Sequence, residues 1–158
     1  RVPRALEIKS ILKENFCLVL PKDHLINEDN FISLAQFKEE SFILFDVKYS
    51  ASYHEKVMQI FDDCGFAPLS SHNTIHSSSI FKLVENNFGI SIVPKSIAQK
   101  RGHKIKFIEL TSISQKTTLS VIWNKKNTNP ILNDVLEIVD SLKTDTSLDK
   151  FKLFKKIK

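Results

Sequence analysis

An unbroken apolar run at residues 16–20, FCLVL, places the tightest constraint on how this chain can fold. Side chains of a β-strand point alternately to opposite faces of the sheet, so a strand without a polar residue is apolar on both faces. Such a strand must be covered on both sides, which is typical of a sheet with helices on its two faces. The run therefore predicts a covered α/β sheet, and Pro21 ends the strand.

Further strands alternate with helix signals along the chain. The pairs Ser33/Gln36 and Ser52/Glu55 have the spacing of a capping box, in which each side chain bonds the other residue's amide at a helix start. This alternation predicts an α/β sheet. The predicted strands cover residues 6–12, 16–20, 42–45, 89–93, 105–107 and 119–123. The predicted helices are a short one after Ser33, two longer ones over about 52–64 and 77–87, a short one near Ile97, and one opened by Asn129-Pro130.

The helix over about residues 52–64 has a broad apolar face. Gly65 can adopt the left-handed conformation that follows many helix ends, and Pro68 blocks a continuation. We expect Met58 and Ile60 to point away from the core-facing side and to seek a second partner, which predicts self-association. The apolar set is Tyr53, Val57, Met58, Ile60, Phe61 and Cys64.

Charge and apolar content exclude several classes of protein. The net charge of +5 comes from five lysines in residues 150–158, and the remaining residues carry equal numbers of basic and acidic side chains. A neutral body does not predict a nucleic-acid face. The apolar runs are too short to span a bilayer. We therefore expect no membrane contact. Cys17 and Cys64 form no CxxC pair, so we also expect free thiols and a cytoplasmic location.

Motifs for catalysis, cofactors or metals are not found in the sequence. It contains no GxGxxG, GxxxxGK[ST], HExxH or GxSxG pattern. His72 and His76 are four residues apart, but they lie on either side of a predicted helix start and would not share a helical face. We therefore expect no catalytic residue, no cofactor and no metal.

Two predicted helix starts offer an alternative kind of site. Residues 49–53 and 74–79 each follow a strand, open a helix and carry hydroxyl groups. Helix starts present unpaired amides and a positive dipole end, and they line the ligand crevice of open α/β sheets. One interpretation is a site for a small anion; the alternative is that these serines only cap helices.

The order of motifs resembles the effector-binding part of LysR-type transcriptional regulators. Residues 16–24 (FCLVLPKDH) are similar to that family's LVLPxxHPL segment, and residues 57–68 to its helix ending in GxxP. Residues 83–94 (LVENNFGISIVP) carry the most specific likeness, to LVaaGlGIsivP. Residues 33–45 and 119–123 match two further segments, so the resemblance extends over residues 1 to about 143.

This resemblance implies a type II periplasmic-binding-protein-like fold with two subdomains, the first one incomplete. Residues 1–20 and 119–143 would form part of subdomain one, residues 21–118 would form subdomain two, and residues 144–158 would be a basic tail. It also implies a cytoplasmic homo-oligomer that senses a small effector, a carboxylate by preference, and that contacts DNA only through a helix-turn-helix absent from this chain. Two alternatives share the fold, a transport solute-binding protein and a prephenate-dehydratase-like enzyme.

The same resemblance implies where the effector would bind. The family holds it in the cleft between the subdomains, beside the loop after Phe45 and the start of the helix at Ser77. The predicted ligand-binding residues are Arg1, Phe45, Ser50, Ser52, Tyr53, Thr74, His76 and Ser77.

Overall fold

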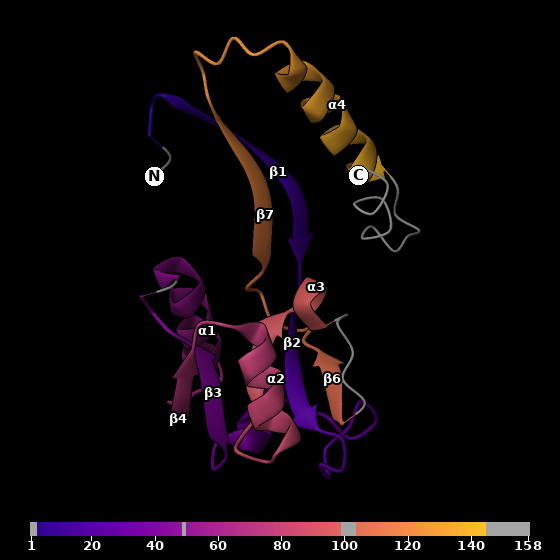
Figure 1. The fold of residues 1–158 in the computed structure, drawn as a ribbon. Helices are drawn as coiled ribbons and strands as arrows, with labels where there is room; N and C mark the ends of the chain where they lie inside the picture. Colours follow the sequence, from indigo (N-terminus) through magenta and orange to yellow (C-terminus); the bar gives the residue numbers. More distant parts are fainter. Residues whose placement is uncertain (1–2, 49, 99–103, 145–158) are drawn as a thin grey trace. The chain divides into compact units, whose positions relative to one another are not determined.

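The computed structural model describes residues 3–48, 50–98 and 104–144 of the chain (Figure 1). The chain divides into two compact units, a continuous larger one over Glu14–Thr117 and a smaller one made of the residues on either side. No helix in the described residues is long and apolar enough to cross a bilayer. The elements are β1 (Leu6–Glu14), β2 (Phe16–Pro21), the 3-10 helix η1 (Leu34–Phe37), β3 (Ser41–Phe45), α1 (Ala51–Asp63), β4 (Leu69–Thr74), α2 (Ser77–Glu85), β5 (Ser91–Pro94), α3 (Lys95–Ala98), β6 (Ile105–Glu109), β7 (Thr117–Asn124) and α4 (Ile131–Thr144).

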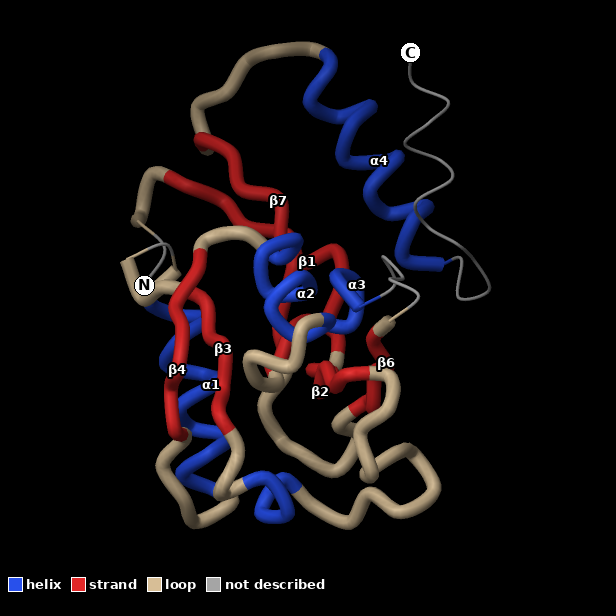
Figure 2. The backbone as a smooth tube through the Cα atoms, turned by 60° about the horizontal axis from the view of Figure 1, so that its bottom comes forward, coloured by secondary structure: helices blue, strands red, loops and turns tan. Residues whose placement is uncertain are grey.

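The larger unit holds two sets of strands that Ile90 joins. β2 lies between β5 and β6 and is antiparallel to both. β3 and β4 are parallel and lie side by side in Figure 2. The Ile90 amide donates to the Ser41 carbonyl at 2.9 Å, and the Ile90 carbonyl accepts from the Ile43 amide at 2.8 Å. This bridge is parallel, so β3, β4 and β5 all run in the same direction. Each of the three is followed by a helix, so their carboxyl ends and three helix starts share one edge.

Helices cover both faces of β2, as the sequence predicts. Phe16, Leu18 and Leu20 are buried and pack with the apolar residues of α1 and η1. Cys17 and Val19 point the other way and pack with those of α2 and α3. The alternation follows the period of two in a strand. The prediction of a covered α/β sheet is therefore confirmed.

Glycine and asparagine end the two long helices of the larger unit. Gly65 follows α1 with a φ of 78°, and its amide donates to the Asp62 carbonyl at 3.0 Å. Asn87 follows α2 with a φ of 59°, and its amide donates to the Val84 carbonyl at 3.0 Å. These are left-handed caps, which satisfy carbonyls left open by a helix end. The predicted role of Gly65 is confirmed.

Two details of α1 differ from the prediction. The helix begins at Ala51 with Ser50 as its N-cap, so Ser52 already lies inside the helix and the predicted capping box with Glu55 is wrong. Ile60 is fully buried, and Met58 packs against the same core cluster. Residues three and four apart share a helix face, so Ile60 lies on the core-facing side with the other buried residues. The expectation that Ile60 and Met58 point outward is wrong.

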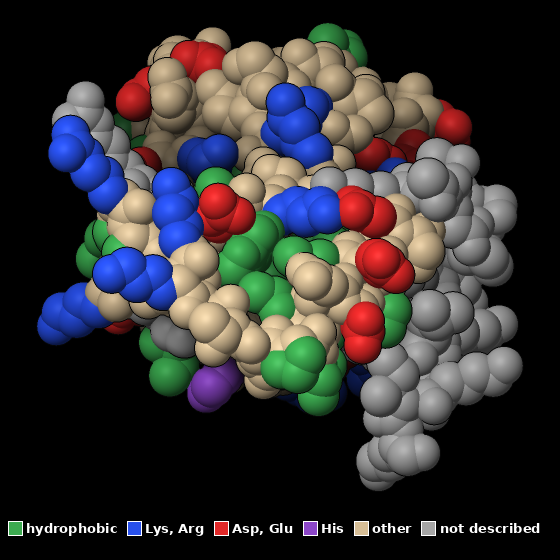
Figure 3. Space-filling model, turned by 90° about the horizontal axis from the view of Figure 1, so that it is seen from above, with side chains coloured by type: hydrophobic (Ala, Val, Ile, Leu, Met, Phe, Trp, Pro, Cys, Tyr) green, Lys and Arg blue, Asp and Glu red, His purple; other side chains and the backbone are tan. Residues whose placement is uncertain are grey.

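The smaller unit has little core of its own. The Ala5 carbonyl, beside the start of β1, accepts from the Lys125 amide, after the end of β7, at 2.9 Å, so the paired strands run in opposite directions. Lys9 of β1 forms an ion pair with Asp140 of α4, with 2.5 Å between nitrogen and oxygen. Val139 is its one buried apolar residue within the described ranges. The face in Figure 3 shows apolar side chains among charged ones of both signs. The exposed large apolar residues of this unit are Ile8, Leu119, Ile122, Ile131, Val135 and Ile138.

The compact units and the predicted subdomains place one strand differently, and the subdomain boundaries stay a prediction. The sequence interpretation assigned residues 16–20 to subdomain one, whereas β2 pairs with β5 and β6 and belongs to the larger unit. The chain changes unit at Glu14, because β1 ends there and β2 enters the covered sheet two residues later. The predicted basic tail lies largely outside the described residues.

Candidate ligand pocket

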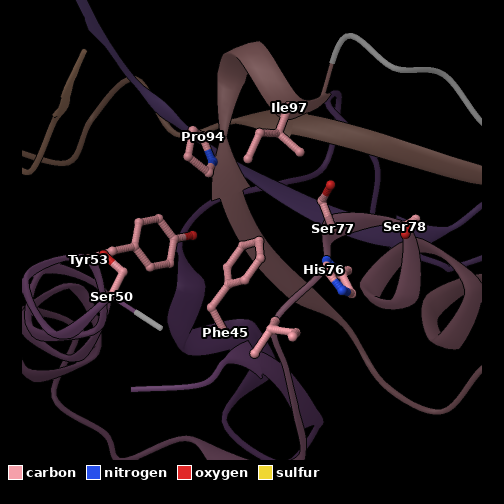
Figure 4. Close-up of a pocket in the computed structure, with 9 residues that line it drawn as sticks. Phe45, Ser50, Tyr53, His76, Ser77, Ser78, Pro94 and Ile97 are labelled. Atoms are coloured by element: carbon pink, nitrogen blue, oxygen red, sulfur yellow. The ribbon is translucent and has the colours of Figure 1, made fainter. Parts of the chain in front are cut away.

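A pocket of about 350 Å³ opens in the larger unit at the shared edge of β3, β4 and β5. Its volume is within the range of small-molecule sites. Figure 4 shows the rings of Tyr53 and Phe45 next to each other, with Ser77 and Ile97 across from them. The pocket is thus built from the ends of strands and the starts of helices. Its lining residues are Phe45, Ser50, Tyr53, Ile75, His76, Ser77, Ser78, Pro94 and Ile97.

Five of the predicted ligand-binding residues line this pocket. The others do not: Ser52 is exposed on α1, and Thr74 uses its hydroxyl oxygen to accept from the His76 amide at 3.4 Å. Arg1 lies outside the described residues. The role of all these residues in binding stays a prediction. The five that line the pocket are Phe45, Ser50, Tyr53, His76 and Ser77.

Sequence reasoning missed two lining residues, Pro94 and Ile97, and it did not select Ile75 and Ser78 as binding residues although both lie in the predicted segment 74–79. Ile75 and Ser78 flank the residues that were selected from the start of α2. Pro94 and Ile97 come from β5 and α3, a third strand followed directly by a helix. The sequence could have identified these two residues, because helix starts that follow parallel strands line the ligand crevice, and this holds after β5 as it does after β3 and β4.

Aromatic side chains form a fixed wall of the pocket. The Tyr53 hydroxyl donates to the Ile92 carbonyl at 2.9 Å. The Tyr53 and Phe45 rings meet edge to face, with 5.3 Å between centroids and 89° between planes. Burial raises the pKa of Tyr53, so its phenol stays neutral. This wall therefore presents a flat, apolar and uncharged surface to the pocket.

Two helix N-termini meet at the pocket. His76 is the N-cap of α2 and Ser50 is the N-cap of α1, and neither side chain makes a capping hydrogen bond. No described residue accepts a hydrogen bond from the backbone amides of Ser77 or Ser78. Neither helix has an acidic residue in its first turn. An anion near such a helix end is stabilised by about 0.3–1 kcal/mol at an exposed site.

The lining residues favour binding over chemistry. None of the nine is Lys, Arg, Asp or Glu. Within the described ranges, no group of three His, Cys, Asp or Glu side chains could hold a metal ion. Cys17 and Cys64 are free, and burial raises the pKa of the Cys17 thiol to about 12, which leaves it unreactive. The pocket therefore presents amides, hydroxyls and apolar walls.

Known proteins share this sequence pattern and this fold. The chain is 24% identical over 152 residues to the HTH-type transcriptional regulator TtuA of Agrobacterium vitis, covering 94% of this chain and 48% of TtuA. It matches the crystal structure of the LysR family transcriptional regulator CbnR with a TM-score of 0.76 and 25% identity, covering 88% of this chain and 48% of CbnR. The BenM effector binding domain with its effector benzoate matches with a TM-score of 0.76 and 18% identity, covering 90% of this chain and 65% of that one.

These matches establish the fold as type II periplasmic-binding-protein-like, as the sequence predicts. The chain spans about half the length of TtuA and of CbnR. The LysR substrate binding domain family matches residues 2–143, which is nearly all of the chain that forms the two units. The alternating strands and helices, the pocket at their shared edge and this match together show that the chain belongs to the LysR substrate binding domain family.

Proposed function

We propose that the pocket binds a small effector with a carboxylate group and a flat apolar body. The observation that carries this proposal is the meeting of two helix N-termini, with no acidic residue in their first turns, at a pocket that Tyr53 and Phe45 also line. The helix ends favour the carboxylate, and the aromatic wall favours the rest of the molecule. Phe45, Ser50, Tyr53, His76 and Ser77 are the proposed ligand-binding residues, joined by Ser78.

The whole regulator would use this domain to sense the effector and a separate segment to bind DNA. TtuA is named an HTH-type transcriptional regulator, and this chain covers 48% of it. The body of the chain has equal numbers of acidic and basic residues, which supports a DNA contact elsewhere in the protein. A ligand changes the output of such a protein only if it binds one of two conformations more tightly. Effector binding would therefore shift the arrangement that presents the DNA-binding segment.

Sensing is favoured over catalysis by the composition of the pocket. The lining contains one imidazole, on the exposed His76, and no carboxylate or thiol. General acid–base or nucleophilic chemistry needs a positioned pair of such groups. The proposed role is therefore that of a regulatory, cytoplasmic binding module and not of an enzyme.

The regulator would work as a homo-oligomer. Because α1 turns its main apolar stripe into the core, the proposed contact surface shifts from this helix to the exposed apolar residues of the smaller unit. β4 adds an exposed strand at the end of its parallel pair. Exposed strand edges and apolar faces are common sites of self-association. Sedimentation at micromolar concentration should show a dimer or larger species, and a monomer over a wide dilution range would contradict this proposal.

Calorimetric titration with benzoate and benzamide tests the binding proposal. The two molecules have similar shape, but only benzoate carries a negative charge. We expect benzoate to bind about five- to tenfold more tightly, since a hydrogen bond to a charged group contributes roughly 1.5–3 kcal/mol against about 0.5–1.5 kcal/mol for a neutral one. Equal binding of the two would contradict the assignment of an anion site.

Single serine variants locate the site. Ser77→Ala removes a pocket hydroxyl at the start of α2, and we expect it to weaken benzoate binding several-fold. Ser70→Ala is the matched control, because Ser70 is an exposed serine of β4 that does not line the pocket. Equal affinities of the two variants would show that the α2 hydroxyl takes no part in binding.

A further inference from the structure

A polar network surrounds Glu14, the last residue of β1. One oxygen of its carboxylate accepts from the Ser96 amide at 2.7 Å, and the other accepts from the Ser96 hydroxyl at 2.8 Å. The oxygen that accepts from the Ser96 hydroxyl also accepts from the Thr117 hydroxyl at 3.3 Å. Glu14 therefore holds a residue of α3 and the first residue of β7 at the same time.

Ser96 belongs to the segment that forms one wall of the pocket. Pro94 and Ile97 both line the pocket, and Ser96 lies between them in sequence. The neighbouring Lys95 is fixed as well, because its amide donates to the Asn15 carbonyl at 3.0 Å. Movement of the Pro94–Ile97 segment would therefore displace residues 14–15 through these hydrogen bonds.

Residues 14 and 117 are the two points at which the chain changes unit. Glu14 begins the larger unit and Thr117 ends it. The residues next to them continue as the β1–β7 strand pair of the smaller unit. Glu14 is the last residue of β1, and it contacts Thr117, the first residue of β7. The contacts of Glu14 therefore reach one end of both strands.

Two other links to this region are weaker. The Lys56 ammonium donates to the Lys116 carbonyl at 2.9 Å, and the Gln115 amide donates to Asp63 at 2.6 Å, but both contacts are exposed. The contacts of Glu14 with Ser96 and Thr117 are partly buried. Exposed polar contacts are screened by water and contribute little. Glu14 therefore provides a partly buried polar connection from α3 to the adjoining ends of β1 and β7, alongside the contacts of Glu109 with Lys95 and Asn15.

We propose that Glu14 is a positioning residue that couples occupancy of the pocket to the order of the β1–β7 strand pair. The inference rests on the proposed function, because it needs a ligand in the pocket. A ligand that contacts Pro94 and Ile97 fixes α3, and the two-point contact with Ser96 carries that constraint to Glu14. The hydrogen bond from Thr117 to Glu14 extends the same constraint to β7, so both strands become more ordered when the ligand binds.

Glutamine at position 14 separates this role from simple packing. Glu14→Gln preserves the size of the side chain but replaces one acceptor oxygen with an NH₂ donor, so the Ser96 amide, the Ser96 hydroxyl and the Thr117 hydroxyl can no longer all donate to it, and the charge that strengthens these contacts is lost. Hydrogen exchange of the 158-residue chain, with and without benzoate, measures the consequence. In the unmodified chain we expect benzoate to slow exchange at residues 77–80 and also in β1 and β7. In Glu14→Gln we expect the first effect to remain and the second to fall at least threefold.

Two control variants and an affinity measurement accompany the exchange experiment. Glu7→Gln is the matched control, since Glu7 is an exposed glutamate of the same strand, and it should behave like the unmodified chain. Ser96→Ala removes only the hydroxyl contact and should give a partial loss, even if Glu14→Gln fails to fold. Calorimetry should show benzoate affinity within about threefold for all these variants, which a merely structural defect would not preserve.

Two negative outcomes have different meanings. If benzoate slows exchange nowhere in the unmodified chain, the proposed function fails and this inference fails with it. If Glu14→Gln and Ser96→Ala retain full benzoate-dependent protection in both β1 and β7, the coupling role of Glu14 is refuted while the proposed function stands.

Discussion

Gly89 is the position at which a single methyl group should damage the sheet most. Its φ is 148°, a region that side chains rarely adopt, and a Cβ built there would lie 2.5 Å from the Ser41 carbonyl oxygen. That oxygen accepts the Ile90 amide at 2.9 Å, which is half of the bridge that joins β3 to the β5 side of the sheet. The Gly89→Ala methyl cannot be accommodated unless the backbone of this bridge moves.

The expected loss of stability follows from two terms. Holding a residue with a side chain at such a φ costs about 1–3 kcal/mol. Displacing Ser41 weakens the two hydrogen bonds of the bridge, each contributing about 1 kcal/mol. We therefore expect Gly89→Ala to lower the free energy of unfolding by about 3–5 kcal/mol. For a domain whose total is about 5–15 kcal/mol, this is a large fraction.

Gly65→Ala is the matched control for this substitution. Gly65 also has a positive φ, 78°, but no atom lies within 4 Å of a Cβ built on it. Its cost should be the backbone term alone, about 1–2 kcal/mol. Urea denaturation measures both variants, and Gly89→Ala should lower the midpoint by about 2 M for a slope near 2 kcal/mol/M. If Gly89→Ala loses no more stability than Gly65→Ala, the close approach to Ser41 does not determine the sheet geometry.

Three further substitutions test the core, the pocket wall and an ion pair. Phe61→Ala should lower the free energy of unfolding by about 3–5 kcal/mol in urea, because Phe61 is fully buried. Tyr53→Phe leaves the Ile92 carbonyl without its donor, and should cost about 1–2 kcal/mol in the same assay. The hydrogen bond from Lys95 lowers the pKa of Glu109, so its contribution is present at neutral pH and is lost as pH falls through that lowered pKa. Unfolding measured from pH 7 to pH 3 should show less loss in Lys95→Met than in the unmodified chain, and equal losses would contradict this role of the pair.

Local signals in the sequence identified most of the larger unit and the start of α4 in the smaller one. The apolar run at residues 16–20 required cover on both faces, and the structure has helices on both. Gly65 marked a helix end because a left-handed residue is needed there, and its φ confirms this. Asn129 marked a helix start, and its side chain accepts from the Ile131 amide at 3.0 Å. Each of these features depends on a few neighbouring residues, which is why the sequence was sufficient.

Features that depend on distant residues were harder to predict. Ser52 and Glu55 have the spacing of a capping box, but α1 begins earlier, at Ala51 with Ser50 as its N-cap, which the spacing alone does not show. Ile60 was expected to face outward, yet it meets side chains from strands far away in the sequence. The pocket wall at Pro94 depends on the parallel bridge at Ile90, which no local pattern records.

The division of the chain into units also has a consequence for the order of folding. The larger unit is one continuous segment, Glu14–Thr117, whereas the smaller unit needs residues from both sides of it. The smaller unit alone would have to close a loop of roughly 100 residues, at an entropic cost of about 4 kcal/mol. Folding of the larger unit brings Glu14 and Thr117 within hydrogen-bonding distance, at 3.3 Å, and thus closes that loop in advance. Pairing of β1 with β7 should therefore be a late event, which begins at the ends beside this contact and proceeds away from it.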